Sequence, residues 1–171
     1  MPNEQLLRFY RGDGTDNEGR RIADVWRYSL DDLEAVHDYI QWLFPLDERS
    51  AFNPHAPLLD AETMAAFRRD ETLRAKVERS LEMMLDFYGF TRAGDRITRG
   101  PAFAERSQQW LRPGNHNFLR LTRMLKSLTL LGHEVHAEQL LTCLEEVYRE
   151  RPGEIGNNTV GYWRRAVDRE Q

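Results

Sequence analysis

The sequence predicts an all-α protein, a compact bundle of about six or seven helices. Apolar residues recur at helical spacing through several long segments, which is the main signal for amphipathic helices. Residues that favour helix starts and stops bracket these segments. The alternating apolar and polar runs that predict a sheet are missing, with one short exception. Gly94 and Asp95 form a turn signal, and we expect a small hairpin in residues 90–100.

The length of 171 residues is that of one ordinary domain. We therefore expect a single domain over residues 1–171. Its N-terminal segment, residues 1–28, is polar and contains three glycines, so we expect it to be partly irregular. The helical core is expected to cover residues 29–168.

Three helices are expected in the first half of the core. Ser29 and Asp70 can each accept hydrogen bonds from the free amides of a first helical turn. Pro45 and Gly89 provide stop signals. The predicted ranges are 29–44, 60–69 and 70–88.

Four further helices are expected after the hairpin. Pro113 and Gly114 separate the first of these helices from the second. Gly132 ends the second helix, and Pro152 ends the third. The predicted ranges are 103–111, 115–131, 134–149 and a last helix from about 158.

Composition favours a soluble, cytoplasmic protein. The net charge is −4 with acids and bases interspersed, which argues against a general nucleic-acid binder. Cys143 is the single cysteine, so no disulfide forms within the chain, and a reducing compartment fits. No apolar run approaches the roughly 18 residues of a membrane span, and the first residues lack the pattern of a signal peptide.

Three segments share an order and spacing that resemble a known family. They are YIQWLFP at 39–45, LDFYG at 85–89 and HNFLRLTRMLK at 116–126. Together they resemble the N-terminal conserved domain of the opioid growth factor receptor family, over roughly residues 25–150. The resemblance implies an α-helical domain. Animal members are described as nucleus-associated receptors for an enkephalin peptide, and the resemblance transfers no catalytic residue.

The chain also differs from those animal members. It lacks their long C-terminal region with repeats and basic targeting signals, so we do not expect nuclear targeting here. Its short length and its preference for arginine over lysine look like those of a bacterial homologue.

The aromatic segment around Tyr39 and Trp42 is the first candidate binding site. Trp42 projects away from the apolar arc of its predicted helix, so it is either covered by another element or exposed at a groove. The loop at 55–57 is the expected cover. His37 falls on the apolar arc, where a lone histidine is usually a core residue.

The second candidate is a stripe of basic residues on the helix at 115–131. His116, Arg120 and Arg123 align on one face, together with Ser127, and Arg112 precedes the helix. Arginine forks match carboxylates and phosphates, so the stripe is a candidate anion site. The alternative is a solvated face with ordinary ion pairs.

Neither a metal site nor a cofactor site is predicted. His133 and His136 are spaced three apart rather than in the four-apart zincin pattern, and the sequence indicates no third ligand. No residues form a recognisable catalytic set, although all-α enzymes without a motif exist. The favoured hypothesis is a non-catalytic peptide- or protein-binding module. The alternative is a small anion- or metabolite-binding protein, or an enzyme, using Arg120, Arg123 and His116. The sequence does not indicate an oligomeric state.

Overall fold

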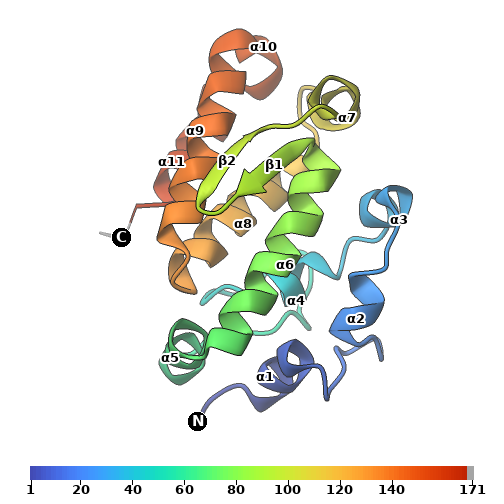
Figure 1. The fold of residues 1–171 in the computed structure, drawn as a ribbon, viewed down its shortest axis with the longest axis vertical. Coiled ribbons are helices and arrows are strands. Elements are labelled where there is room, and N and C mark those ends of the chain that lie inside the picture. The colour runs from blue at the N-terminus through green and yellow to red at the C-terminus, as the bar shows by residue number, and fades with distance from the viewer. Residues whose placement is uncertain (169–171) are drawn as a thin grey trace. The chain divides into compact units, whose positions relative to one another are not determined.

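The structure is a computed structural model that describes residues 1–168. Within these residues it contains eleven helices and one two-stranded sheet (Figure 1), which confirms the all-α class. The helices outnumber the expected six or seven because several are single turns of four residues. The chain divides into two compact units at Met83, inside helix α6, and each unit is described by itself. The expectation of one domain stays a prediction.

The first unit opens with a helix that belongs to the core. Helix α1 (Glu4–Arg11) starts where the Asn3 side chain accepts a hydrogen bond from the Leu6 amide, and it ends at Gly12 with φ of 94°. Its apolar face is buried. The Tyr10 hydroxyl donates to the Leu43 carbonyl at 2.6 Å, which ties α1 to a later segment of the same unit. Residues 1–28 therefore contain more regular structure than their composition indicates.

A polar loop joins α1 to the next helix, α2 (Ile22–Val25). The Asp16 carboxylate, 3% exposed, accepts hydrogen bonds from the backbone amides of Glu18 and Arg20, both at 2.9 Å. The Arg20 side chain donates to Asp16 at 2.7 Å and to Asp38 at 2.9 Å. This arginine holds the loop in a defined shape and connects it to residues eighteen positions later.

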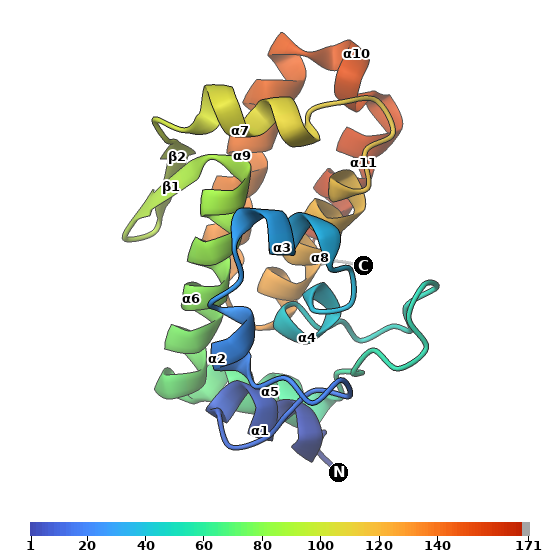
Figure 2. The same ribbon diagram turned by 90° about the vertical axis from the view of Figure 1, so that its right-hand side faces the viewer.

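The prediction of a single helix over residues 29–44 is wrong. The structure has two short helices instead, α3 (Leu30–Ala35) and α4 (Ile40–Leu43), seen as separate pieces in Figure 2. Ser29 caps α3 as expected, but Val36 is extended, with φ of −89° and ψ of 132°. The break allows the Tyr39 hydroxyl to donate to the Leu33 carbonyl at 2.6 Å. His37 lies in this break and is exposed, so its placement on an apolar arc is also wrong.

The other two helices of the first half agree with expectation. Helix α5 (Ala61–Arg69) follows Asp60, whose carboxylate accepts from the Thr63 amide at 2.8 Å. Helix α6 (Glu71–Tyr88) follows Asp70, whose carboxylate accepts from the Thr72 amide at 2.9 Å. A loop without helices joins α4 to α5, and Figure 2 shows how far it extends from them.

The second unit begins at Met84 and contains the predicted hairpin. Strands β1 (Phe90–Ala93) and β2 (Arg96–Arg99) are antiparallel, with Phe90 opposite Arg99. Helix α7 (Phe103–Trp110) follows. Its Trp110 indole donates to the Tyr88 carbonyl at 3.1 Å, so α7 is anchored to the last turn of α6.

Three helices and a short connecting turn complete the second unit. They are α8 (Asn117–Leu130), α9 (Glu134–Glu150), α10 (Pro152–Ile155) and α11 (Asn157–Ala166). Helix α8 packs against both α9 and α11 (Figure 1). The Trp163 indole of α11 donates to the Phe118 carbonyl of α8 at 3.1 Å. Only α10 was not expected from the sequence.

Candidate functional site

The aromatic candidates Tyr39 and Trp42 are buried in the first unit, with exposed fractions of 0% and 2%. The Trp42 ring packs edge-on against Phe9 of α1, with centroids 5.3 Å apart. Its indole Nε1 donates to the Asn17 side chain at 3.1 Å. The Trp42 side chain is therefore partnered by the N-terminal segment, whereas the loop at 55–57 was the expected cover.

The basic stripe on α8 does not form a continuous solvent-facing surface. Arg120 is 5% exposed and Ser127 is 0% exposed, whereas His116 is exposed and Arg123 is half-buried. The alternative of a solvated face therefore does not hold for Arg120 and Ser127, because α8 is packed by neighbouring helices on more than one side. Arg120 Nη1 donates to the Asn117 side-chain oxygen Oδ1 at 3.5 Å, and the same oxygen accepts from the Tyr88 hydroxyl at 3.2 Å.

The six candidate residues do not gather in one place that the structure defines. Tyr39 and Trp42 belong to the first unit, and the other four belong to the second. Arg112 is exposed, and its guanidinium Nε donates to the Gln108 carbonyl at 3.0 Å. This contact places Arg112 beside a pocket of the second unit.

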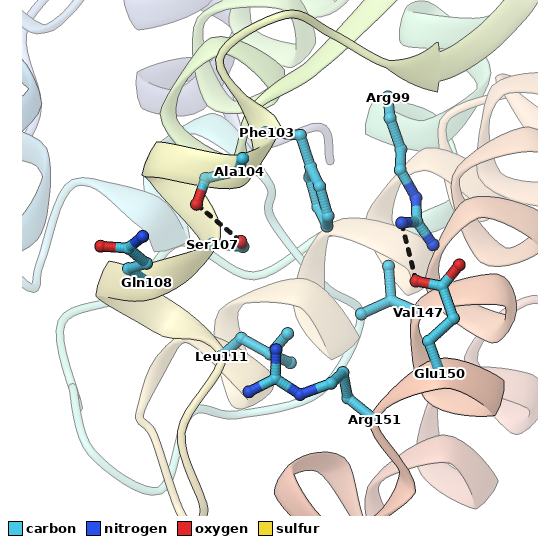
Figure 3. A pocket seen from close by; sticks show the side chains of 9 residues that line it. All are labelled: Arg99, Phe103, Ala104, Ser107, Gln108, Leu111, Val147, Glu150 and Arg151. Atoms are coloured by element: carbon cyan, nitrogen blue, oxygen red, sulfur yellow. Dashed lines mark hydrogen bonds and ion pairs between the residues drawn. The ribbon is translucent and has the colours of Figure 1, made fainter.

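This pocket, called here the α7–α9 pocket, has a volume of about 400 Å³ (Figure 3). It lies between the end of β2, helix α7 and the C-terminal end of α9. Phe103, Leu111 and Val147 contribute apolar surface, and five of the nine lining residues are polar or charged. The nine lining residues are Arg99, Phe103, Ala104, Ser107, Gln108, Leu111, Val147, Glu150 and Arg151.

Charged side chains of both signs line the pocket. An Arg99 Nη1 nitrogen lies 2.8 Å from a Glu150 carboxylate oxygen, and the Arg99 guanidinium stacks over the Phe103 ring at 4.7 Å (Figure 3). Arg151 pairs outside the pocket with Glu154 at 3.0 Å. The hydrogen bond from Arg151 lowers the pKa of Glu154, so this carboxylate stays ionised at neutral pH.

The side chains that line the pocket offer both apolar surface and charged groups to a ligand. The nine residues include no histidine or cysteine, and the Ser107 hydroxyl donates to the Ala104 carbonyl of its own helix at 3.4 Å. Apolar side chains together with a few charged groups are typical of ligand sites.

Sequence reasoning missed this pocket because its residues come from segments about fifty positions apart, without a motif. One signal was available. Residues 90–112 contain five arginines and two acidic residues, a net charge of +3, although the whole chain carries −4. That local excess of positive charge marks the region that forms one wall of the pocket.

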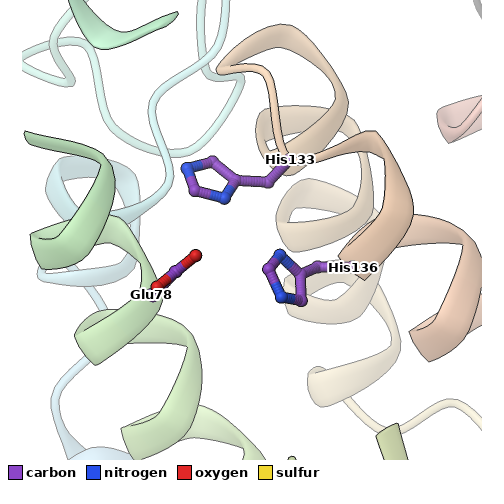
Figure 4. A group of neighbouring side chains, drawn as sticks. All are labelled: Glu78, His133 and His136. Atoms are coloured by element: carbon purple, nitrogen blue, oxygen red, sulfur yellow. The ribbon is translucent and has the colours of Figure 1, made fainter. Parts of the chain in front are cut away.

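His133 and His136 lie together at the start of α9 (Figure 4). Their ring centroids are 5.6 Å apart, and both side chains are buried, with 2% and 4% exposed. An Asp95 carboxylate oxygen from the hairpin turn lies 3.6 Å from His136 Nε2. This contact was not expected from the sequence, because Asp95 belongs to a different segment of the chain.

A family model describing the opioid growth factor receptor conserved region matches residues 4–171. The chain belongs to the opioid growth factor receptor family. This confirms the resemblance carried by the segments at 39–45, 85–89 and 116–126.

Several relatives in this family are similar to the chain over most of its length. The opioid growth factor receptor of Homo sapiens is 40% identical over 152 residues, which is 85% of this chain and 22% of the relative. That of Rattus norvegicus is 38% identical over 142 residues, 79% of this chain and 24% of the relative. The opioid growth factor receptor-like protein 1 of Xenopus tropicalis is 37% identical over 142 residues, 78% of this chain and 27% of the relative.

The chain spans about a quarter of the length of these relatives. No solved structure matches it. Among residues 1–168, no helix has both the length and the apolar character that a membrane crossing requires.

Proposed function

We propose that this family member is a non-catalytic peptide- or protein-binding module, and that the α7–α9 pocket receives part of the partner. The pocket itself is the main support. Its volume of about 400 Å³ falls in the range of ligand sites, and its lining combines apolar and charged side chains. Phe103 offers an aromatic surface of the kind that anchors partners at interfaces.

Family membership supports the same proposal more weakly. The relatives carry the name of a receptor for a growth factor, and the matched region covers about a quarter of each. We extend to this chain only the general idea of partner recognition. The buried free thiol of Cys143 agrees with a reducing compartment, so we also propose a cytoplasmic location.

The alternative of an anion- or metabolite-binding protein built on Arg120, Arg123 and His116 has less support. Arg120 is 5% exposed and contacts Asn117, so its guanidinium is held inside the protein rather than offered to solvent. A nucleic-acid partner is not favoured by the net charge of −4.

The proposal can be tested by closing the pocket from its exposed edge. Ala104 lines the pocket and is exposed on α7, so Ala104→Trp fills the opening without disturbing the core. Gln109 is exposed on the same helix and does not line the pocket, so Gln109→Trp is the matched control.

A random peptide library is selected on the immobilised wild-type chain, and enriched peptides are measured against both variants by fluorescence anisotropy. We expect binding to be lost with Ala104→Trp and kept with Gln109→Trp, while circular dichroism shows both variants folded. Enriched peptides that bind both variants equally, or the absence of any enrichment, would contradict the proposal.

A further inference from the structure

The lining of the α7–α9 pocket contains two arginines, Arg99 and Arg151, and one acidic residue, Glu150, so its net charge is +1. Residues 90–112, which form one wall, contain five arginines and two acidic residues, and of these arginines Arg99 lines the pocket, whereas the whole chain has a net charge of −4. A local positive field on an otherwise acidic protein attracts anionic partners to one place and repels them elsewhere. The charge distribution therefore favours an acidic occupant over a basic one.

Two guanidinium groups reach the pocket with hydrogen-bond donors still available. A guanidinium has five N–H donors. The hydrogen bonds and ion pairs found among residues 1–168 use one nitrogen of Arg99, with Glu150, and two nitrogens of Arg151, with Glu154. Arg99 is also held in place by stacking over Phe103 at 4.7 Å. A pre-oriented arginine loses little entropy on binding a carboxylate.

The remaining lining sets the size and polarity of what fits. A volume of about 400 Å³ lies near the lower end for ligand sites, which suits one or two residues of a peptide rather than a whole helix. Phe103, Leu111 and Val147 provide apolar contact for a single large side chain. The occupant therefore needs an apolar side chain next to a carboxylate.

We propose that the pocket binds an acidic peptide segment, with one large apolar side chain of the segment against Phe103 and a neighbouring aspartate or glutamate carboxylate on Arg99 and Arg151. This inference rests on the proposed function. In the free protein the Glu150 carboxylate is paired with Arg99 at 2.8 Å. The peptide carboxylate displaces the Glu150 carboxylate from Arg99. Glu150 is well placed to swing away because its side chain is 59% exposed.

This arrangement predicts effects of opposite sign for the two members of one ion pair. Arg99→Gln removes a donor to the peptide carboxylate and weakens binding. Glu150→Gln removes a competing carboxylate and strengthens it. If the Arg99–Glu150 pair acted only to hold the pocket together, both substitutions would weaken binding.

The experiment uses short fluorescein-labelled peptides with one central leucine, in three versions whose other residues are acidic, neutral amides or lysines. Their affinities are measured for the full chain and for Arg99→Gln, Arg151→Gln, Glu150→Gln and Ala104→Trp. Arg96 is exposed on β2 and does not line the pocket, so Arg96→Gln controls for the loss of one positive charge.

We expect the acidic peptide to bind most tightly, with an affinity that falls as salt is added. Arg99→Gln and Arg151→Gln should each weaken it by about tenfold, since a hydrogen bond to a charged group is lost. Arg96→Gln should change the affinity by less than about threefold, as expected for an exposed charge that does not line the pocket. Glu150→Gln should strengthen binding.

Two results overturn the inference in distinguishable ways. If neutral or basic peptides bind as well as acidic ones and Ala104→Trp still abolishes binding, the pocket binds peptides without selecting acids, and only the inference fails. If no peptide shows binding that Ala104→Trp removes, neither the inference nor the proposed function stands.

Discussion

The indole Nε1 of Trp42 donates a hydrogen bond to the Asn17 side chain at 3.1 Å, and this bond joins α4 to the loop after α1. The same indole ring packs on Phe9, with centroids 5.3 Å apart. Trp42 was a candidate for ligand contact because it projects from the apolar arc of its predicted helix. In the structure it is 2% exposed and serves the packing of the first unit.

Replacing this side chain should therefore destabilise the protein. We expect Trp42→Ala to lower the free energy of unfolding by about 3–5 kcal/mol, the usual cost of removing a buried aromatic side chain. Asn17→Ala should cost only about 1 kcal/mol, because it removes a single hydrogen bond. Urea denaturation followed by circular dichroism measures both. Phe52 is 82% exposed, and Phe52→Ala is the control, with an expected change within about 0.5 kcal/mol. A Trp42→Ala variant as stable as this control would contradict the assignment.

The Asp16 carboxylate should matter more than Asp38 for the stability of the N-terminal loop. Asp16 is buried and accepts from two backbone amides as well as from Arg20, whereas the Asp38 side chain is 39% exposed. Burial by itself lowers the pKa of Arg20, but its hydrogen bonds to Tyr28, Asp38 and Asp16 raise that pKa above its ordinary value. The guanidinium therefore stays charged and needs a partner.

We expect Asp16→Ala to cost about 3 kcal/mol or more, because it leaves two backbone amides unpaired and removes the buried one of the two carboxylates that pair with the Arg20 guanidinium. Asp38→Ala should cost about 1 kcal/mol or less, as is usual for an ion pair near solvent. Thermal and urea unfolding of the two variants give the comparison. Equal losses of stability would show that the loop does not depend on the buried carboxylate.

Local signals in the sequence predicted the elements whose ends are determined by neighbouring residues. Asp70 and Gly89 bracket α6 as expected, and the turn at Gly94 and Asp95 produces the hairpin. The break between α3 and α4 could not be predicted in this way. It depends on the contact of Asp38 with Arg20, eighteen residues earlier, and on the Tyr39 hydroxyl reaching the Leu33 carbonyl.

The burial of Arg120 and the α7–α9 pocket could not be predicted from local signals either. The face of a helix that meets solvent follows from periodicity only when the helix has neighbours on one side. Helix α8 packs against both α9 and α11, so Arg120 is buried although it lies opposite the main apolar arc. The α7–α9 pocket depends on how Arg99 and Arg151 come together, which no local pattern encodes.

Gly89 should tolerate no side chain, because its φ of +93° and its surroundings both exclude one. A Cβ atom there would lie 2.6 Å from the Phe103 Cα atom, which is backbone and cannot move aside cheaply. We expect Gly89→Ala to lower the free energy of unfolding by about 3 kcal/mol, from left-handed strain plus overpacking. Gly94 has φ of +60° with nothing within 4 Å, so Gly94→Ala should cost only about 1 kcal/mol. Denaturant melts of the two variants that coincide would show that α7 does not pack closely on the end of α6.

The Cys143 thiol should be unreactive in the folded protein at neutral pH. It is 4% exposed, and its Sγ donates to the Ile97 carbonyl at 3.1 Å. Burial, and then the nearby charge of Glu146, raise the pKa of Cys143 to about 11, against a partial lowering by Arg99. The thiolate is the reactive form, so labelling with a disulfide reagent should be slow when the protein is folded and fast in denaturant.

The raised pKa of Cys143 also makes stability depend on pH in a defined direction. The thiol form is favoured in the folded state, whereas the unfolded thiol ionises from about pH 8.5. The unfolded state therefore binds fewer protons between that pH and the folded pKa of about 11, and the stability supplied by the neutral thiol is lost as the pH rises through this window. Urea denaturation at pH 7 and pH 10 should show a smaller loss of stability in Cys143→Ala than in the wild type. Losses of equal size in the two proteins would mean that Cys143 does not contribute to this alkaline sensitivity.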